Sequence, residues 1–463
     1  MDTTSLRRRR SSILAVAVLV AGLAGCQAAS TPSGSSTPGP SSATSPAPTA
    51  GHTTAPSAAA GVPHATLVVS RAGDPRWRLI DAANGEDLVT NDEFSIPVGA
   101  PRPGWGRIVS AAIDGARTVV RDDVVQPGFG GPQLAIDGRW SLPTIGDGGL
   151  PAGVSADGST IVMKDAGAAA DAATTRFAIV EHTVAGQPST SGDADLRLVR
   201  ILELAGRFTF DALSSDGRIL YVVEHLDAAA GGHYQVRAVD LPAGSLRPDI
   251  IVDKANPDEW MAGYPIAQVR RADGVVMTLY DGPEHPFIHA LQSNEAWALC
   301  IDLPQAAGAE RSAWGLVADA DGRMVYAANG SSGLVVEVDP EQFAISRTAT
   351  LQTTAATSIV LAKFGHSDVG PIGGQVVALP GGKGLLVGVG SDVANVNGKD
   401  FREVGRIDLG HPIRSLGMTP DGSIAFASTV DGRIVAFEPR PAGRVYGDVP
   451  NGPFSGLLAV APW

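Results

Sequence analysis

Two neighbouring stretches of the sequence concentrate residues that bind ligands or do chemistry. They are KANPDEWMAGYP at residues 254–265 and DGPEHPFIH at residues 281–289. Carboxylates and imidazoles hydrogen-bond to polar ligands, and Trp and Tyr offer flat apolar faces with a polar edge. The candidate ligand-binding residues are Asp258, Glu259, Trp260, Tyr264, Glu284, His285 and His289. Alternatively, these residues bind no ligand: the polar ones simply occupy turns, and a histidine lies in the core on a strand.

Neither these two stretches nor the other motifs of the sequence form a recognisable catalytic or metal site. His285 and His289 have the spacing at which two histidines on a helix share a metal, but Pro286 and the surrounding β pattern predict a loop and a strand. The sequence DADG at residues 319–322 lacks the third oxygen ligand and the distant Glu of a calcium loop. The glycine-rich run at 381–390 lacks the Lys-Ser/Thr of a phosphate loop, and a Gly-x-Ser-x-Gly elbow is missing. We therefore predict no metal and no catalytic residue, cannot name a cofactor, and favour a binding protein over an enzyme.

Short apolar strands separated by turn residues surround both stretches. Residues 313–351 show the pattern most regularly, with breaks at Asp321-Gly322, at Asn329-Gly330 through Gly333, and at Asp339-Pro340. The runs between the breaks are Trp314 to Ala318, Met324 to Ala328, Leu334 to Val338 and Ile345 to Leu351. Asp-Gly and Asn-Gly supply the positive φ of tight hairpins, and Pro340 cannot continue a paired strand. This stretch therefore predicts a four-stranded antiparallel meander.

Copies of this unit recur along the chain at intervals of 40 to 60 residues. The turn motifs are Ile113-Asp114-Gly115, Ala156-Asp157-Gly158, Ser215-Asp216-Gly217, Ala272-Asp273-Gly274, Ala320-Asp321-Gly322, Pro380-Gly381-Gly382 and Pro420-Asp421-Gly422. Amphipathic runs of helical length are missing, so helical repeats are excluded. We predict an all-β protein with a single β-propeller of four-stranded blades.

The two ends of the repeat region complement each other. Residues Thr66 to Ser70, Trp77 to Asp81 and Phe94 to Val98 have the pattern of the last three strands of a blade, and Ser455 to Pro462 that of a lone first strand. A composite blade from both termini would close the ring and remove its exposed edges. Seven internal units and the composite make eight blades, and one miscounted unit would make seven.

Two segments carry a resemblance to a known family, namely ADGRMVYAANGSSGLVVEVDP at 320–340 and PDGSIAFASTVDGRIVAFEP at 420–439. They resemble the YVTN/NHL-like and quinoprotein-amine-dehydrogenase-like propellers of bacterial surface proteins. The resemblance covers residues 65–463 and implies the fold but no activity. The Gly-His and Trp-Asp pattern of WD40 repeats is missing, and the seven Trp show no repeat per blade that would stack a quinone.

The first 64 residues contain a targeting segment, at residues 1–26, followed by a tether. Arg7 to Arg10 precede the apolar run Ile13 to Leu23, which is too short to span a bilayer, and Leu23-Ala24-Gly25-Cys26 follows. This segment resembles the signal peptides of bacterial lipoproteins, which implies cleavage after residue 25 and lipidation of Cys26. Residues 26–64 are rich in Ser, Thr, Pro and Ala and predict a disordered tether. The alternative is an ordinary secretory signal with a chance cysteine.

The net charge limits the function further. The formal net charge of −13 disfavours a nucleic-acid ligand, because phosphate binding needs a basic face. We expect a monomeric, lipid-anchored protein on the outer side of the cell membrane that binds a protein or a glycan near the mouth of the propeller channel. One alternative is an extracytoplasmic enzyme with its site at the channel mouth, which could be a hydrolase, lactonase-like or quinone-dependent. The other alternative is a propeller that serves only as a spacer or assembly platform. We expect the second cysteine, Cys300, to be a buried strand thiol.

Overall fold

The computed structural model describes most of the chain beyond residue 60. The described residues are 61–88, 99–101, 106–124, 131–145, 151–168, 172–183, 195–226, 232–255, 260–307, 309–310, 313–353 and 374–461. These ranges leave out the expected signal peptide, Cys26, nearly all of the expected tether, the strand expected at Phe94 to Val98, and the candidates Asp258 and Glu259. Within them, no helix is long and apolar enough to cross a membrane.

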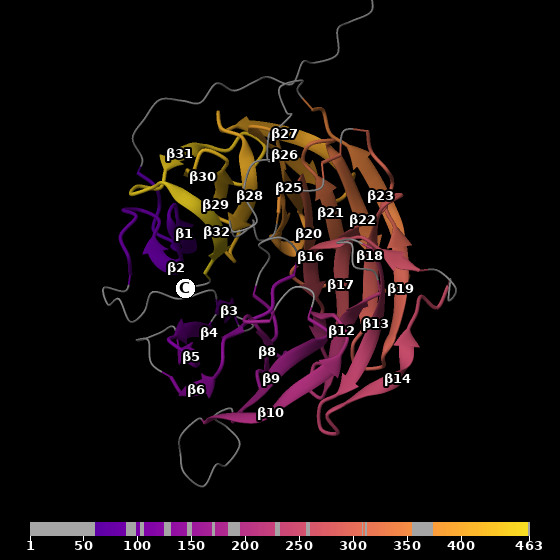
Figure 1. Ribbon diagram of the computed structural model, residues 1–463. Coiled ribbons are helices and arrows are strands. Elements are labelled where there is room, and N and C mark those ends of the chain that lie inside the picture. Colours follow the sequence, from indigo (N-terminus) through magenta and orange to yellow (C-terminus); the bar gives the residue numbers. More distant parts are fainter. Residues whose placement is uncertain are drawn as a thin grey trace, which may run out of the picture. The chain divides into compact units, whose positions relative to one another are not determined.

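Eight antiparallel sheets follow one another along the described chain, so the predicted all-β propeller with eight blades is confirmed (Figure 1). The first two four-stranded sheets contain β3 (Gly99–Pro101), β4 (Arg107–Asp114), β5 (Arg117–Val124) and β6 (Gln133–Asp137), then β7 (Trp140–Ser141), β8 (Thr160–Asp165), β9 (Thr174–His182) and β10 (Leu196–Ala205). The next two contain β11 (Phe208–Leu213), β12 (Ile219–His225), β13 (His233–Asp240) and β14 (Ser245–Ile251) with the short β15 (Met261–Ala262), then β16 (Tyr264–Arg270), β17 (Val275–Asp281), β18 (Pro286–Gln292) and β19 (Trp297–Asp302).

The remaining sheets repeat the same order. Three of them contain β20 (Trp314–Ala318), β21 (Val325–Asn329), β22 (Leu334–Asp339) and β23 (Ala344–Thr350), then β24 (Val376–Leu379), β25 (Gly384–Val389), β26 (Asp392–Asn397) and β27 (Arg402–Asp408), then β28 (Ile413–Met418), β29 (Ala425–Thr429), β30 (Ile434–Phe437) and β31 (Val445–Asp448). The eighth sheet has the order β2-β1-β32, from Asp74–Asp81, Thr66–Arg71 and Phe454–Val460. We call each sheet a blade and number the strands within it from the inside, because the first strands of successive blades contact each other.

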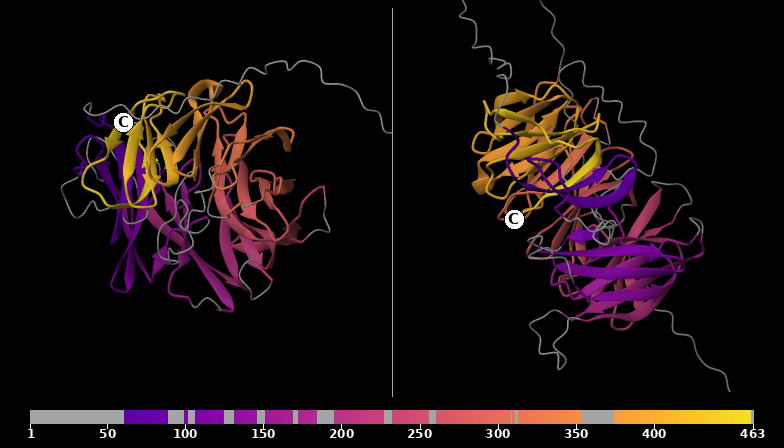
Figure 2. Two further views of the ribbon diagram at one scale, coloured as in Figure 1. Left: turned by 90° about the horizontal axis from the view of Figure 1, so that it is seen from above. Right: turned by 90° about the vertical axis from the view of Figure 1, so that its left-hand side faces the viewer.

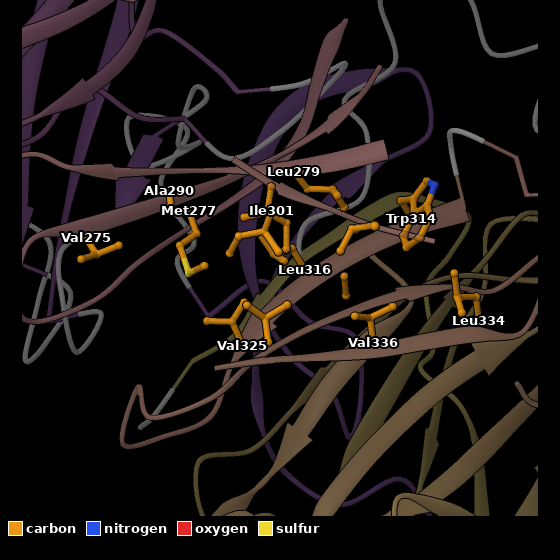
Figure 3. Packing of buried hydrophobic residues seen from close by; sticks show 14 residues of the cluster. Val275, Met277, Leu279, Ala290, Ile301, Trp314, Leu316, Val325, Leu334 and Val336 are labelled. Atoms are coloured by element: carbon orange, nitrogen blue, oxygen red, sulfur yellow. The ribbon is translucent and has the colours of Figure 1, made fainter. Parts of the chain in front are cut away.

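The blades are held together by apolar side chains on their facing surfaces. One cluster joins the β16–β19 blade to the β20–β23 blade and contains Met277, Ile288, Leu316 and Val336, all buried. Figure 3 shows side chains from both blades meeting in this cluster. Strands alternate their side chains between two faces, so a strand between two neighbouring blades is apolar on both. The unbroken apolar runs in the sequence follow from this packing.

The two chain ends meet in the composite blade. Strand β32 pairs antiparallel with β1, and Leu67 lies opposite Val460. In both views of Figure 2, the yellow C-terminal strands lie beside the indigo N-terminal strands. Phe454 and Leu457 are buried between this blade and the β28–β31 blade. The C-terminal strand therefore closes the ring, as the sequence predicts.

Turn glycines mark the hairpins as expected, with one difference. Each of the seven repeated turn motifs has a glycine with φ between 60° and 88°. These glycines are Gly115, Gly158, Gly217, Gly274, Gly322, Gly381 and Gly422. Six of these turns precede the second strand of their blade, whereas Asp114-Gly115 joins the second strand β4 to the third strand β5. A positive φ serves any tight hairpin, so the motif alone does not identify which hairpin of the blade it closes.

The predicted role of Asn329-Gly330 is wrong. The positive φ in this hairpin belongs to Gly333, at 72°, and Gly330 has none. A Cβ atom at Gly330 would lie 1.5 Å from Gln375 Oε1 and 2.3 Å from the carbonyl oxygen of Gly388. Glycine is required at 330 because the next blade approaches its backbone closely.

Candidate ligand-binding site

A pocket of about 310 Å³ lies between the outer strands of the β11–β14 and β16–β19 blades. Its lining comes from β13, β15, the β17–β18 turn and β19, and we call it the outer pocket. None of these elements is an innermost strand, so the pocket does not lie at the channel mouth, where we expected the candidate residues. The lining residues are His233, Asp253, Trp260, Met261, Ala262, Gly282, Pro283, Glu284, His285, Phe287, Cys300 and Asp302.

The short strand β15 brings Trp260 to the rim of this pocket. Its residues Met261 and Ala262 pair with Tyr234 and His233 on the outer edge of β13, beyond the residues that pair with β14. Trp260 then lies edge-on to the His233 ring, with 6.2 Å between ring centroids, and 63% of it is exposed. Its exposed indole offers a flat apolar face with a polar N–H at its edge to anything that enters the pocket.

Asp253 ties the two blades together behind the pocket. The backbone of Asp253 forms a parallel β-bridge with Ala298. The buried Asp253 carboxylate accepts hydrogen bonds from the backbone N–H of Ala255 at 2.7 Å and from that of Cys300 at 3.2 Å. Cys300 takes part in no disulfide among the described residues; it is half-buried and lines the pocket. The expectation of a fully buried strand thiol is therefore wrong, because the outer face of β19 is only partly covered.

Carboxylates and imidazoles supply the polar side of the outer pocket, and its described lining residues include no Lys or Arg. His285 Nε2 lies 2.9 Å from Asp302 Oδ1, and the Asp302 side chain is 70% exposed. Glu284 is exposed on the adjacent turn. Both acidic side chains can accept hydrogen bonds from a ligand that lies against Trp260 and Phe287.

His289 lies behind the pocket and is only 1% exposed. Burial lowers the pKa of His289 to about 4, although the nearby Asp253 carboxylate acts in the opposite direction, so the ring is neutral at neutral pH. His289 and Cys300 are register partners on β18 and β19, but His289 Nε2 has no hydrogen-bond partner among the described residues.

A buried carboxylate and a half-buried guanidinium lie on the innermost strands of the same two blades. Asp211 on β11 is 2% exposed, and its Oδ2 atom has no hydrogen-bond partner among the described residues. Burial raises the pKa of Asp211 to about 7, and the positive charge of Arg270 on β16 only partly opposes this shift. Burial in turn lowers the pKa of Arg270. Sequence analysis singled out neither residue of this pair, because their proximity depends on the packing of two blades.

The structure divides the candidate residues into three groups. Trp260, Glu284 and His285 come together in the outer pocket. Tyr264 begins the innermost strand β16, and His289 is buried, so neither lines the pocket. Asp258 and Glu259 lie outside the described residues. Sequence analysis did not include His233, Asp253, Cys300 and Asp302 among the candidates. Three of them lie on strands with an ordinary blade pattern, and Asp253 lies just after β14. Among the described residues, no group of three or more His, Cys, Asp and Glu side chains could hold a metal ion.

Comparison with known proteins supports the fold alone. No protein-family model and no curated protein matches the sequence. Dihydro-heme d1 dehydrogenase NirN, solved in complex with DHE, is similar with a TM-score of 0.51 and 13% identity, over 85% of this chain and 74% of that chain. Sqt1 from Saccharomyces cerevisiae has a TM-score of 0.46 and 12% identity (76% and 84% covered), and BamB from Moraxella catarrhalis has 0.45 and 12% (77% and 86%). The fold and the comparisons together define a β-propeller protein with eight blades.

Proposed function

We propose that this protein is a lipid-anchored, extracytoplasmic β-propeller that binds a glycan in its outer pocket. The observation that carries the proposal is Trp260, an aromatic ring that is 63% exposed at the rim of a cavity. A sugar ring presents C–H groups on its face and hydroxyl groups on its edge. The C–H groups can pack on the indole of Trp260, and the hydroxyl groups can donate hydrogen bonds to Glu284 and Asp302.

The size of the outer pocket favours a small ligand over a folded partner. Its volume of about 310 Å³ is at the lower end of the range for small-molecule sites, which runs from about 300 to 1,000 Å³. A stable protein interface buries about 800 Å² on each partner and needs a broad surface rather than a cavity. One or two sugar rings at the end of a chain fit this volume.

The N-terminal sequence supports the proposed location. Arg7 to Arg10, the apolar run Ile13 to Leu23 and the small residues before Cys26 form a lipoprotein-type signal. Lipidation at Cys26 would hold the chain at the membrane, and the tether would allow the propeller to reach glycans of the cell envelope.

The test is retention of the full-length protein, purified in detergent, on immobilised oligosaccharides released from the envelope of the producing cells. We expect the wild-type protein to bind a subset of them and Trp260→Ala to lose at least about tenfold in affinity, which corresponds to about 1.4 kcal/mol. Val404→Ala is the matched control, since Val404 is 48% exposed on β27 and does not line the pocket. Equal binding by wild type and Trp260→Ala, or no binding by the wild type, would contradict the proposal.

A further inference from the structure

Three carboxylates line the outer pocket, and none of them has a Lys or Arg partner among the described residues. They belong to Asp253, Glu284 and Asp302. The Asp302 carboxylate lies beside His285, and the Asp253 carboxylate accepts backbone N–H groups. Glu284 is exposed on the β17–β18 turn and forms no ion pair or hydrogen bond with a described residue. These carboxylates can therefore accept hydrogen bonds from a cationic group of a ligand.

The basic residue nearest to this lining in the sequence is Lys254, which is directed elsewhere. It follows Asp253, but its Nζ lies 3.9 Å from the centroid of the Trp297 ring. Trp297 and Cys300 are three residues apart on β19, so their side chains leave opposite faces of the strand. Cys300 lines the outer pocket, whereas Trp297 contacts Phe343 of the next blade. Lys254 therefore does not neutralise the carboxylates of the pocket.

The sequence around the lining residues adds acidic groups and no basic ones. The undescribed residues within five positions of a lining residue are 228–231 and 256–259. They include Asp258 and Glu259 but no Lys or Arg, so they can only add negative charge to that of the described lining. The formal net charge of the whole chain, −13, has the same sign. A ligand that enters this pocket gains from carrying a positive charge.

The uncharged part of the pocket also suits a cation. Trp260 is 63% exposed, and the face of an indole attracts an ammonium group within about 6 Å of its centroid. Behind the lining, Nε2 of the buried His289 has no hydrogen-bond partner among the described residues. Phe287, two residues before His289 on β18, and its register partner Cys300 both line the pocket. Nε2 is thus a buried polar atom that a ligand or a water molecule in the pocket can satisfy.

We propose that the outer pocket selects a glycan with a free amino group, such as a hexosamine that is not N-acetylated. This specificity rests on the function proposed above, because it concerns the same pocket. The ammonium group of such a sugar has three N–H donors, and Glu284 and Asp302 can accept charge-assisted hydrogen bonds from them. An N-acetylated sugar has one neutral N–H at this position, and an anionic sugar would be repelled by the two carboxylates.

The test is calorimetric titration of the full-length protein, in detergent at about pH 7, with two ligands. One is a glucosamine disaccharide, and the other is the same disaccharide with both amino groups acetylated. Amines of this kind are mostly protonated at about pH 7. We expect both to bind and the amino form to have a Kd lower by about fivefold or more, because charge-assisted hydrogen bonds replace neutral ones.

Glu284→Gln tests the charge, because it removes the carboxylate and keeps a hydrogen-bond acceptor of nearly the same shape. The ratio of the two Kd values should fall toward one in this variant, and Asp302→Asn should act in the same direction. Glu341→Gln is the matched control, since Glu341 is exposed between β22 and β23 and does not line the pocket, and it should keep the wild-type ratio. Trp260→Ala should weaken the binding of both disaccharides.

The outcomes separate this specificity from the proposed function. Equal affinity for the two disaccharides, tighter binding of the acetylated form, or a wild-type ratio in both folded Glu284→Gln and Asp302→Asn would overturn the amine preference and leave a glycan site at Trp260 intact. If neither disaccharide binds, the preference is also overturned, and retention on the immobilised envelope oligosaccharides decides the proposed function by itself. Unchanged affinity of Trp260→Ala for both disaccharides would contradict both proposals.

Discussion

The buried carboxylate of Asp211 leads to a prediction about how stability depends on pH. In the folded protein the pKa of Asp211 is raised to about 7, against an ordinary value of 3.8. Between these two values the folded protein keeps a proton that the unfolded chain releases. The free energy of unfolding therefore falls as pH rises from about 4 to about 7, and this contribution stays constant at higher pH.

The size of the effect follows from the pKa shift. Each unit of pKa difference corresponds to about 1.36 kcal/mol, so a rise from 3.8 to about 7 destabilises the protein by about 4 kcal/mol at high pH. Between about pH 5 and about pH 8 the expected loss is roughly 2 to 3 kcal/mol, because part of the change occurs below pH 5. Asp211→Asn has nearly the same shape and no charge, so it should lose this dependence.

The assay is chemical denaturation of wild type and Asp211→Asn at about pH 5 and about pH 8, followed by tryptophan fluorescence. We expect the variant to gain roughly 2 to 3 kcal/mol relative to wild type between the two pH values. Asp249→Asn, at an exposed position on β14, controls for the loss of one acid and should behave like the wild type. A stability difference between Asp211→Asn and wild type that does not change with pH would refute the reasoning.

Two further predictions concern the closure of the ring and the anchor. Leu457→Ala should lower the free energy of unfolding by about 2 to 5 kcal/mol in denaturant titration, because Leu457 is 2% exposed where β32 packs in the composite blade. Deletion of residues 455–463 removes most of this strand and should lower the free energy of unfolding further. An unchanged melting temperature of the truncated protein would contradict the closure. Cys26→Ala should release the protein into the medium or leave its signal uncleaved, as seen by fractionation and mass spectrometry. Normal processing with full membrane retention would exclude lipidation at this position.

Much of the fold was predictable from local chemistry. The Asp-Gly turns need a positive φ that Gly322 and its counterparts provide, and the apolar runs between them specify strands, so the number of blades follows from counting. The failures arose where a neighbouring blade decides the conformation. Gly330 is required by the approach of Gln375 and Gly388 from the next blade, and no local pattern reveals that contact.

The candidate site was predictable only in part, for the same reason. Trp260, Glu284 and His285 lie in polar segments that interrupt the repeat, and such interruptions are visible in a sequence. Asp302 lies on a strand with an ordinary pattern, and Asp253 lies just after β14. Both reach the outer pocket through the packing of two blades.

The measurement that tests the central claim most directly is a crystal structure of the protein with an oligosaccharide that it retains. The account predicts a sugar ring stacked on Trp260, with hydroxyl groups donating to Glu284 and Asp302 between the outer strands of the β11–β14 and β16–β19 blades. A ring bound at the innermost strands, or anywhere away from Trp260, would contradict it.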